Sequence, residues 1–357
     1  NGAGDRLAVG EMAEADKGAV RLFSFTDTSF SSGTLTATIG DGFTGTKDVS
    51  LSLDSGDDFG SGVSLSDDAR LLVVGAPGDD TSTLTDAGAA YLFSFTDGDF
   101  SGGTSTGTMG SGYSSAGDVA VSLAANDAFG ASVSLDGDGN RLAVGMSGDT
   151  GPDGDGNAGA VALFTFGDTS FTNGAHVGTV GDGYSGTNDI NVSLLDKNYY
   201  FGTAVALNST GDRLAVGAPS ADGNSESDAG AVFIFGFNNS DFTSGELTQL
   251  IGEGYTDSKE FDVTNIDASD SFGASVAFNA FGTRLAVGAT GDDGSANGES
   301  NAGAVHLLSA AHASGAYGAN GQTFANLASD SVTVNAYEVA DILARGADLT
   351  LQASNDI

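Results

Sequence analysis

The chain has 357 residues, of which 48 are acidic and 11 basic, and its formal net charge is −37. A surface this acidic repels a phosphate backbone, so we expect no nucleic-acid partner. The absence of cysteine rules out disulfides, thiolate metal sites and a cysteine nucleophile, and no apolar run approaches the roughly twenty residues of a membrane span.

One short phrase recurs five times and divides the chain into modules. It reads Arg-Leu-Ala-Val-Gly in four copies and Leu-Leu-Val-Val-Gly in the other. Its closing glycines lie 65 to 72 residues apart, at Gly10, Gly75, Gly145, Gly217 and Gly288. Because repeated units build one architecture out of many short pieces, we assign residues 1–309 to a single five-module domain.

Each module contains four segments that predict strands. The first begins at a Phe-Gly pair, and in residues 129–135 its large and small side chains alternate, so its small face allows a close approach by a neighbouring sheet or by the module axis. The second is the apolar Leu-Ala-Val-Gly phrase, typical of a strand buried on both faces. The third opens at Gly-Ala-Val and is rich in aromatic and β-branched residues.

The fourth strand is expected at residues 34–39, 104–109, 176–180 and 246–251. Short segments such as 49–53 and 190–194 either add a fifth strand or cross to the next module. Four strands per repeated module indicate the blades of a β-propeller, whereas a β-helix repeats every twenty to thirty residues or so. The fold prediction is therefore all-β, a β-propeller of about five blades.

The two ends of this propeller are incomplete in the sequence. The first module has no Phe-Gly strand, and the last has no fourth strand after Leu308. Either strands from both ends complete one blade, giving five blades, or the missing strands come from sequence beyond this chain.

The modules resemble a known family. A Phe-Gly pair, a polar loop and then Leu-Val-Val-Gly75-Ala76-Pro77 look like the FG-GAP repeat of integrin α-type propellers. The longer phrase, with Gly-Asp-Arg before Leu-Ala-Val-Gly and Ala-Gly-Ala-Val after the loop, is similar to repeats of large bacterial adhesins of the secreted filamentous-haemagglutinin type. Residues 331–357 look like the start of a haemagglutinin β-helix, and residues 310–330 read as a linker.

The resemblance draws attention to one position just before the second strand. Integrin-type blades commonly bind calcium there, and the place of the last Asp ligand is occupied in four modules by arginine, at Arg6, Arg141, Arg213 and Arg284. A guanidinium does not ligate calcium, so we expect structural arginines that pair with acids such as Asp138 or Asp212 or fork onto loop carbonyls. The alternative is an arginine whose aliphatic stem covers the strand end.

The loop between the second and third strands is the remaining candidate for a metal site. Its oxygen-bearing side chains are Asp79, Asp80, Asp86, Asp149, Asp153, Asp155, Asn157, Asp222, Asn224, Asp228, Asp292, Asp293 and Asn301. Hard oxygen ligands at alternating positions suit Ca²⁺, which is the tentative cofactor prediction. The loops differ in length, however, so the alternative is that these side chains cap turns.

Catalysis is not expected. The three histidines follow no common position in the modules, and no nucleophile elbow or phosphate-binding loop is present. We therefore predict a structural and adhesive module, secreted to a bacterial cell surface or extracellular filament. Its expected partners are other copies of itself, neighbouring domains of a larger chain, or host-cell and matrix glycans and proteins, without membrane insertion. The alternative is a carbohydrate-binding or carbohydrate-active propeller.

Overall fold

The computed structural model describes residues 1–309 except 13, 82, 155, 169, 224–225, 239–240, 256–258, 264–265 and 294–300. Residues Asn1–Leu308 form one compact unit. The predicted linker at 310–330 and the predicted β-helix segment at 331–357 lie outside the described residues. In the part of the chain that is described, no helix is long and apolar enough to cross a membrane.

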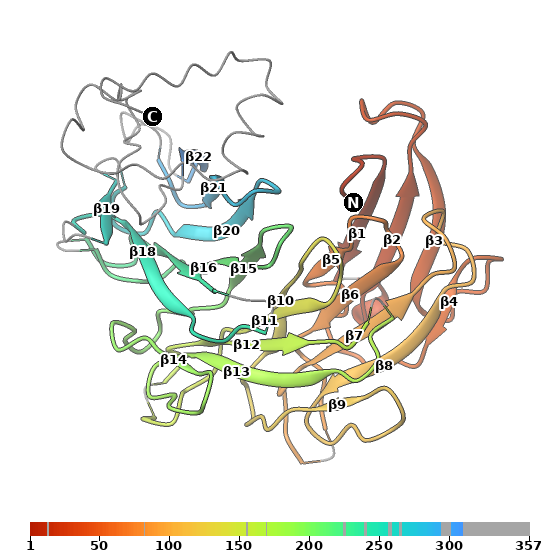
Figure 1. Ribbon diagram of the computed structural model, residues 1–357, viewed down its shortest axis with the longest axis horizontal. Coiled ribbons are helices and arrows are strands. Elements are labelled where there is room, and N and C mark those ends of the chain that lie inside the picture. The colour runs from red at the N-terminus through yellow and green to blue at the C-terminus, as the bar shows by residue number, and fades with distance from the viewer. Residues whose placement is uncertain are drawn as a thin grey trace, which may run out of the picture. The chain divides into compact units, whose positions relative to one another are not determined.

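The compact unit consists of five sheets that follow one another in chain order (Figure 1). Blade 1 contains β1 (Arg6–Glu11), β2 (Ala19–Ser24), β3 (Thr34–Asp41) and β4 (Val49–Leu51), with the short helix η1 (Glu14–Asp16) between its first two strands. Blade 2 contains β5 (Val63–Leu65), β6 (Leu71–Ala76), β7 (Ala89–Ser94), β8 (Thr104–Gly110) and β9 (Val119–Ala120).

Blade 3 contains β10 (Phe129–Leu135), β11 (Arg141–Met146), β12 (Ala160–Thr165), β13 (Ala175–Gly181) and β14 (Ile190–Asn191). Blade 4 contains β15 (Ala204–Leu207), β16 (Arg213–Ala218), β17 (Ala231–Gly236), β18 (Glu246–Gly252) and β19 (Glu260–Asp262). Blade 5 contains β20 (Phe272–Phe278), β21 (Arg284–Ala289) and β22 (Ala304–Ser309). The all-β, five-bladed prediction is confirmed, with four to five strands in each of the first four blades.

Each blade is an antiparallel meander with one parallel addition. In blade 3, β10, β11, β12 and β13 pair in chain order as antiparallel neighbours, and β14 then pairs in parallel with β13. The same parallel fifth strand occurs as β4, β9 and β19. The short segments at 49–53 and 190–194, for which the sequence allowed either a fifth strand or a crossing to the next module, therefore contain fifth strands.

Two faces of each blade build the core. The upstream face of a blade, which points toward the preceding blade, carries Leu72, Val74 and Phe93 in blade 2, and these pack with Leu22 and Ile39 of blade 1. The downstream face, which points toward the next blade, carries residues such as Leu92 and Met109, which pack with blade 3. Alternation along each strand sends successive side chains to opposite faces, so every inner blade is covered on both sides.

A glycine contact sets how closely consecutive blades approach. A Cβ added at Gly75 would lie 1.9 Å from the carbonyl oxygen of Gly130, the glycine of the next Phe-Gly pair. The same contact joins Gly10 to Gly60, Gly145 to Gly202, and Gly217 to Gly273. Beside it, the Phe of each Phe-Gly pair forms a parallel bridge with the glycine that opens the third strand of the preceding blade, as between Phe129 and Gly88. The small face of the first strand therefore meets the neighbouring blade.

The ends of the series differ from the inner blades. β1 is an edge strand, and no other strand in the described residues pairs with its outer side. Blade 5 has three strands among the described residues. Completion of one blade by strands from both ends is therefore not seen in the described part of the chain.

We expect Gly75→Ala to destabilise the protein by about 2 kcal/mol or more, because the added methyl group meets backbone that cannot move without separating two blades. Gly156→Ala is the matched control, since a Cβ there meets nothing within 4 Å. Urea denaturation of the two variants measures the difference. Equal midpoints for both variants would show that the contact does not set the blade spacing.

Candidate functional site

The acidic loops lie at one end of the blades, at the carboxyl end of each second strand. In blade 2 the loop follows β6 and begins with Asp79, which is buried. Its Oδ2 accepts a hydrogen bond from the Tyr91 hydroxyl at 2.7 Å, and its Oδ1 accepts one from the Tyr113 hydroxyl at 2.8 Å. Tyr91 comes from β7 and Tyr113 from the loop after β8, so one carboxylate joins three segments of the blade.

Burial dominates the electrostatics of this cluster. It raises the pKa of Asp79, and the two tyrosine hydrogen bonds only partly oppose it. Burial, with the nearby Asp79 charge, also raises the pKa values of Tyr91 and Tyr113. Both tyrosines therefore remain protonated donors, and each oxygen of the carboxylate accepts one of their hydrogen bonds.

Blade 3 repeats the cluster with one tyrosine. The Oδ2 atom of Asp149 accepts hydrogen bonds from the Tyr184 hydroxyl at 2.9 Å and from the backbone N–H of Gly151 at 3.0 Å. Burial raises the pKa of Asp149 as well. The residues after β11 thus fold inward in the same way as those after β6.

The other blades replace the cluster with different chemistry. In blade 5 the Asp292 carboxylate lies 3.5 Å from Nε2 of His306, which takes the position of Tyr91. In blade 4 the position of Asp79 is a buried alanine, Ala221, and the Tyr255 hydroxyl donates to the backbone carbonyl of Asp222 at 3.0 Å. In blade 1 an ion pair occupies this place, with Arg21 Nε donating to Glu11 at 2.7 Å.

A second buried carboxyl faces the same end of the blade from the loop before the first strand. In blade 3 it is Asp127, whose Oδ2 accepts the backbone N–H of Ala124 at 2.6 Å. Burial, with the nearby charge of Asp149, raises the pKa of Asp127 to about 6. Burial likewise raises the pKa of the equivalent Asp57 of blade 2 to about 6. Two neighbouring buried carboxyls therefore favour protonation of one of them near neutral pH.

The remaining acids of these loops cap turns or lie at the surface. The Oδ1 of Asp80 accepts the N–H of Asp86 at 2.7 Å, and Asp222 does the same for Asp228 at 3.0 Å. Five residues in equivalent places have a left-handed backbone, which turns the chain into the third strand: Asp16, Asp86, Asn157, Asp228 and Asn301. Asp293 accepts the N–H of Asn301 at 2.5 Å, and Asp153 is exposed. Asp155 and Asn224 lie outside the described residues.

The structure does not gather these acids into a multidentate cluster where it describes them. Among the described residues, no group of three or more His, Cys, Asp or Glu side chains has the spacing of a metal site. The contacts of Asp79, Asp80, Asp149 and Asp222 are those of turn caps and internal hydrogen bonds. Calcium binding in these loops stays a prediction.

The structural arginines lie at the opposite end of the second strands and cross to the next blade. A guanidinium nitrogen of Arg141, which is buried, donates to the carbonyl of Thr210 in blade 4. Arg213 donates to the carbonyl of Gly282 in blade 5 at 2.9 Å. Arg6 reaches the carbonyl of Gly98 in blade 2 at 2.7 Å. Arg284, in blade 5, is exposed.

Sequence reasoning missed the partners of the buried acids. Tyr113 and Tyr184, each of which closes a Gly-x-Gly-Tyr pattern after the fourth strand, donate to the loop carboxylates. The acids two residues before Phe-Gly, at Asp57, Asp127 and Asp270, were not singled out. An acid at this position in modules 2, 3 and 5, with Tyr199 in module 4, is the regularity from which these residues could have been predicted.

Comparison with known families gives one match, which covers parts of two blades. The FG-GAP repeat family matches residues 53–93 and 196–235, which run from the loop before the first strand to the third strand. The chain carries FG-GAP repeats. The matched repeats lie in blades 2 and 4 of the five-bladed propeller, and the glycine contact recurs between each pair of consecutive blades.

Comparison with curated proteins finds no significant relative. Among solved structures, Chaetomium thermophilum Sqt1 bound to the N-terminus of a ribosomal protein is 12% identical with a TM-score of 0.40, covering 80% of this chain and 54% of that one. A putative 6-phosphogluconolactonase from Bacteroides uniformis is 10% identical with a TM-score of 0.45, covering 86% of this chain and 64% of that one. The chain thus spans less than two thirds of either protein, and neither likeness bears on its function.

We expect Asp127→Asn to change how stability depends on pH. An acid whose folded pKa is about 6, against 3.8 as the ordinary value, stabilises the fold below about pH 4 and loses that contribution as pH rises to about 6. The asparagine keeps an oxygen acceptor for the N–H of Ala124. Above pH 6 the free energy of unfolding of the variant should therefore exceed that of wild type by on the order of 1 kcal/mol.

Thermal melts at pH 4 and pH 7.5 measure this change. Asp138→Asn, at an exposed position on the other end of the blade, is the control for loss of one negative charge. A constant difference between Asp127→Asn and wild type at both pH values would contradict the assignment.

We expect Arg141→Ala to cost about 2–3 kcal/mol, because it removes a charged hydrogen bond to the next blade and the packing of a buried stem. Arg284→Ala removes the same side chain at an exposed position and should cost less than about 0.5 kcal/mol. Chemical denaturation of both variants tests the bridging role. Equal losses would refute it.

Proposed function

We propose that this FG-GAP propeller is a structural and adhesive, non-catalytic module of a large secreted bacterial surface protein or filament. The observation that carries the proposal is the equivalence of the blades. The same loop follows the second strand in blades 2 to 5, and its backbone closes the same way, with the glycine before the third strand donating to the loop carbonyl. Four similar sites around one scaffold favour repeated weak contacts over a single reaction centre.

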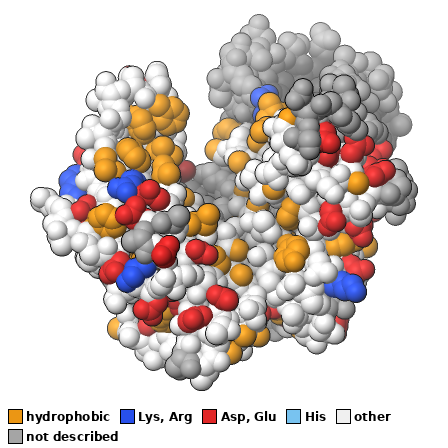
Figure 2. Space-filling view, turned by 180° about the vertical axis from the view of Figure 1, so that it is seen from behind, with side chains coloured by type: hydrophobic (Ala, Val, Ile, Leu, Met, Phe, Trp, Pro, Cys, Tyr) orange, Lys and Arg blue, Asp and Glu red, His pale blue; other side chains and the backbone are white. Residues whose placement is uncertain are grey.

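The charge of these loops indicates the chemistry of a ligand. Asp80, Asp153 and Asp222 are exposed in three successive blades, at the same end of the sheets. Figure 2 shows acidic side chains over much of the visible face and few lysines or arginines. The proposed partners are therefore host-cell or matrix proteins with basic surfaces, or glycans with hydrogen-bond donors. Long-range attraction of a basic partner weakens as salt concentration rises.

The alternative, a carbohydrate-active propeller, needs one blade that departs from the others in its chemistry. Blade 4 is the candidate, because Ala221 and Tyr199 replace the two buried acids there. This exchange removes carboxyls instead of adding them, so it does not assemble the acid pair that glycoside hydrolysis requires.

The test is a binding screen of the full chain on a glycan array and on a panel of immobilised matrix proteins, with mass spectrometry of each bound sugar. We expect saturable binding that leaves the ligand intact. The triple variant Asp80→Asn, Asp153→Asn, Asp222→Asn should bind the same partner at least tenfold more weakly, and each single variant only a few-fold.

The matched control is Asp68→Asn, Asp138→Asn, Asp212→Asn, which removes three exposed carboxylates from the same blades at their other end. It should bind as wild type does. Release of a cleaved sugar from any glycan would contradict the non-catalytic proposal, and equal loss in both triple variants would contradict binding through the acidic loops.

A further inference from the structure

A connector leads from the last strand of one blade into the first strand of the next, and it carries the second buried acid. In the connector into blade 3, residues 121–128, the N–H of Asn126 donates to the carbonyl of Thr85 at 2.9 Å, and that of Ala128 donates to the carbonyl of Asp86 at 3.1 Å. Both acceptors belong to the acidic loop of blade 2. One side of the connector is therefore bound to the preceding blade.

The other side of the same connector is held against the loop of its own blade. The carbonyl of Asp127 accepts the N–H of Gly148 at 3.1 Å, and a Cβ added at Gly148 would lie 1.9 Å from the carbonyl oxygen of Asn126. Asp149 follows directly in the chain, and Asp127 and Asp149 are only 4% and 8% exposed. The two buried acids thus come from two segments whose backbones are in contact.

The glycine and the two acids recur as a set. The sets are Gly78, Asp79 and Asp57 in blade 2 and Gly291, Asp292 and Asp270 in blade 5. In each set the glycine N–H donates to the carbonyl of the connector acid, at 3.2 Å in blade 2 and 2.9 Å in blade 5. Blade 4 departs in all three places at once, with Ser220, Ala221 and Tyr199. This joint replacement indicates that the three residues work as one unit.

The connector into blade 4 keeps the bonds to the preceding blade although it lacks the acid pair. The N–H of Asn198 donates to the carbonyl of Gly156 at 2.9 Å, and that of Tyr200 donates to the carbonyl of Asn157 at 3.1 Å, as in blade 3. Tyr199, which stands in the place of the connector acid, is partly buried against the apolar core. Blade 4 is therefore a control for the acid pair within the same molecule.

The charged and titratable groups that face the pairs are mainly acids and tyrosines. They are Tyr184 and Asp189 in blade 3; Asp54, Asp80, Tyr91, Tyr113 and the Lys17 ammonium from blade 1 in blade 2; and Asp267, Asp293 and His306 in blade 5. Burial, with the neighbouring carboxyl charges, raises the pKa of Asp57 and of Asp127 to about 6. Ionisation of both acids of a pair is therefore unfavourable.

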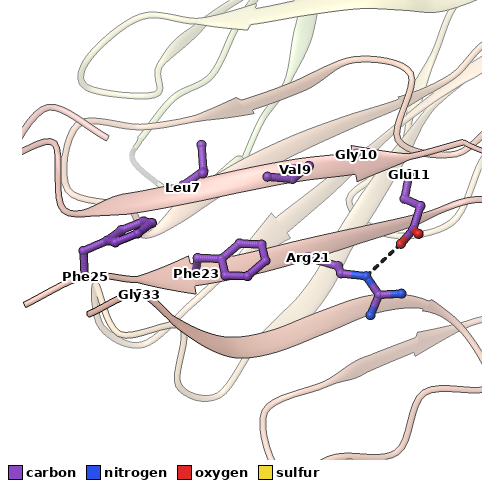
Figure 3. Close-up of a pocket in the computed structure, with 8 residues that line it drawn as sticks. All are labelled: Leu7, Val9, Gly10, Glu11, Arg21, Phe23, Phe25 and Gly33. Atoms are coloured by element: carbon purple, nitrogen blue, oxygen red, sulfur yellow. Dashed lines mark hydrogen bonds and ion pairs between the residues drawn. The ribbon is translucent and has the colours of Figure 1, made fainter. Parts of the chain in front are cut away.

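Blade 1 has a permanent cation at the equivalent place. Arg21 holds the position of Tyr91 on the third strand, and its guanidinium pairs with Glu11 at 2.7 Å (Figure 3). The same guanidinium lies 3.5 Å from Glu14. Because arginine stays charged in proteins, it offsets these acids without a proton.

We propose that each acid pair, such as Asp127 and Asp149, is a proton-dependent clasp, which holds its connector while one acid is protonated and loosens it when both ionise. With one proton the pair bears a single negative charge, whereas two carboxylates that solvent scarcely reaches repel each other. This repulsion acts between the connector and the loop of its own blade, across the Gly148 hydrogen bond. The clasp goes beyond the proposed binding function and does not depend on a ligand.

Amide hydrogen exchange of the full chain at pH 4.5 and pH 8, with a metal chelator present, tests the clasp. Protection is corrected for the intrinsic exchange rate at each pH. The folded pKa of Asp127 is about 6, against 3.8 as the ordinary value, so its stabilising effect is lost as pH rises through this interval. We expect residues 124–131 to lose about tenfold in protection or more, and residues 196–203, which enter blade 4, to change less than about threefold.

Two variants assign the effect to particular pairs. Asp127→Asn keeps an acceptor but cannot ionise, so it should abolish the pH dependence at residues 124–131 and leave that at residues 54–61, which enter blade 2. Asp57→Asn should do the reverse, and it keeps the test decisive if Asp127→Asn does not fold. Asp138→Asn, at an exposed position on the other end of blade 3, is the matched control and should change neither.

Equal loss of protection in the connectors into blades 3 and 4 would overturn the proposal, because blade 4 has no acid pair. An Asp127→Asn variant that keeps the wild-type pH dependence at residues 124–131 would overturn it as well. Recovery of protection at pH 8 when Ca²⁺ replaces the chelator would assign the acids to a metal site and would equally contradict a clasp that depends on protons.

Discussion

The spacing between blades depends on glycine meeting glycine. Where the second strand of one blade meets the Phe-Gly strand of the next, the two backbones lie too close for any side chain, as at Gly145 and Gly202. This approach lets the phenylalanine of each Phe-Gly pair lie fully buried between the sheets. Phe201, for example, packs edge-on against Phe235, with 6.1 Å between the ring centroids. The remaining apolar residues then fill the space that the glycine contact defines.

Polar groups secure the two ends of this apolar stack in different ways. At one end of blades 2 and 3, the buried carboxylates of Asp79 and Asp149 accept hydrogen bonds from tyrosines elsewhere in the same blade. At the other end, arginines such as Arg213 hold the turn of the following blade. The carboxylate–tyrosine hydrogen bonds link segments within a blade, whereas the arginine–carbonyl hydrogen bonds link a blade to its neighbour.

Local pattern was enough to predict the strands, because a propeller blade is built from contacts close in sequence. The fourth strand expected at residues 104–109 is found at Thr104–Gly110, and the Leu-Ala-Val-Gly phrase is a strand in every blade. The inward rotation of Asp79 could not be predicted in the same way, since its partner Tyr113 comes 34 residues later from another loop. The carbonyl that Arg141 contacts belongs to another blade, 69 residues away. Such pairings depend on how blades stack, which the pattern of one module does not contain.

The blades stabilise one another through their covered faces, and amide hydrogen exchange measures this stabilisation strand by strand. β1 and β11 have nearly the same sequence, but β11 lies between two strands and two blades, whereas β1 is an edge strand with one face uncovered. We expect amides of β11 to exchange at least a hundredfold more slowly than their counterparts in β1. Equal protection of the two strands would contradict it.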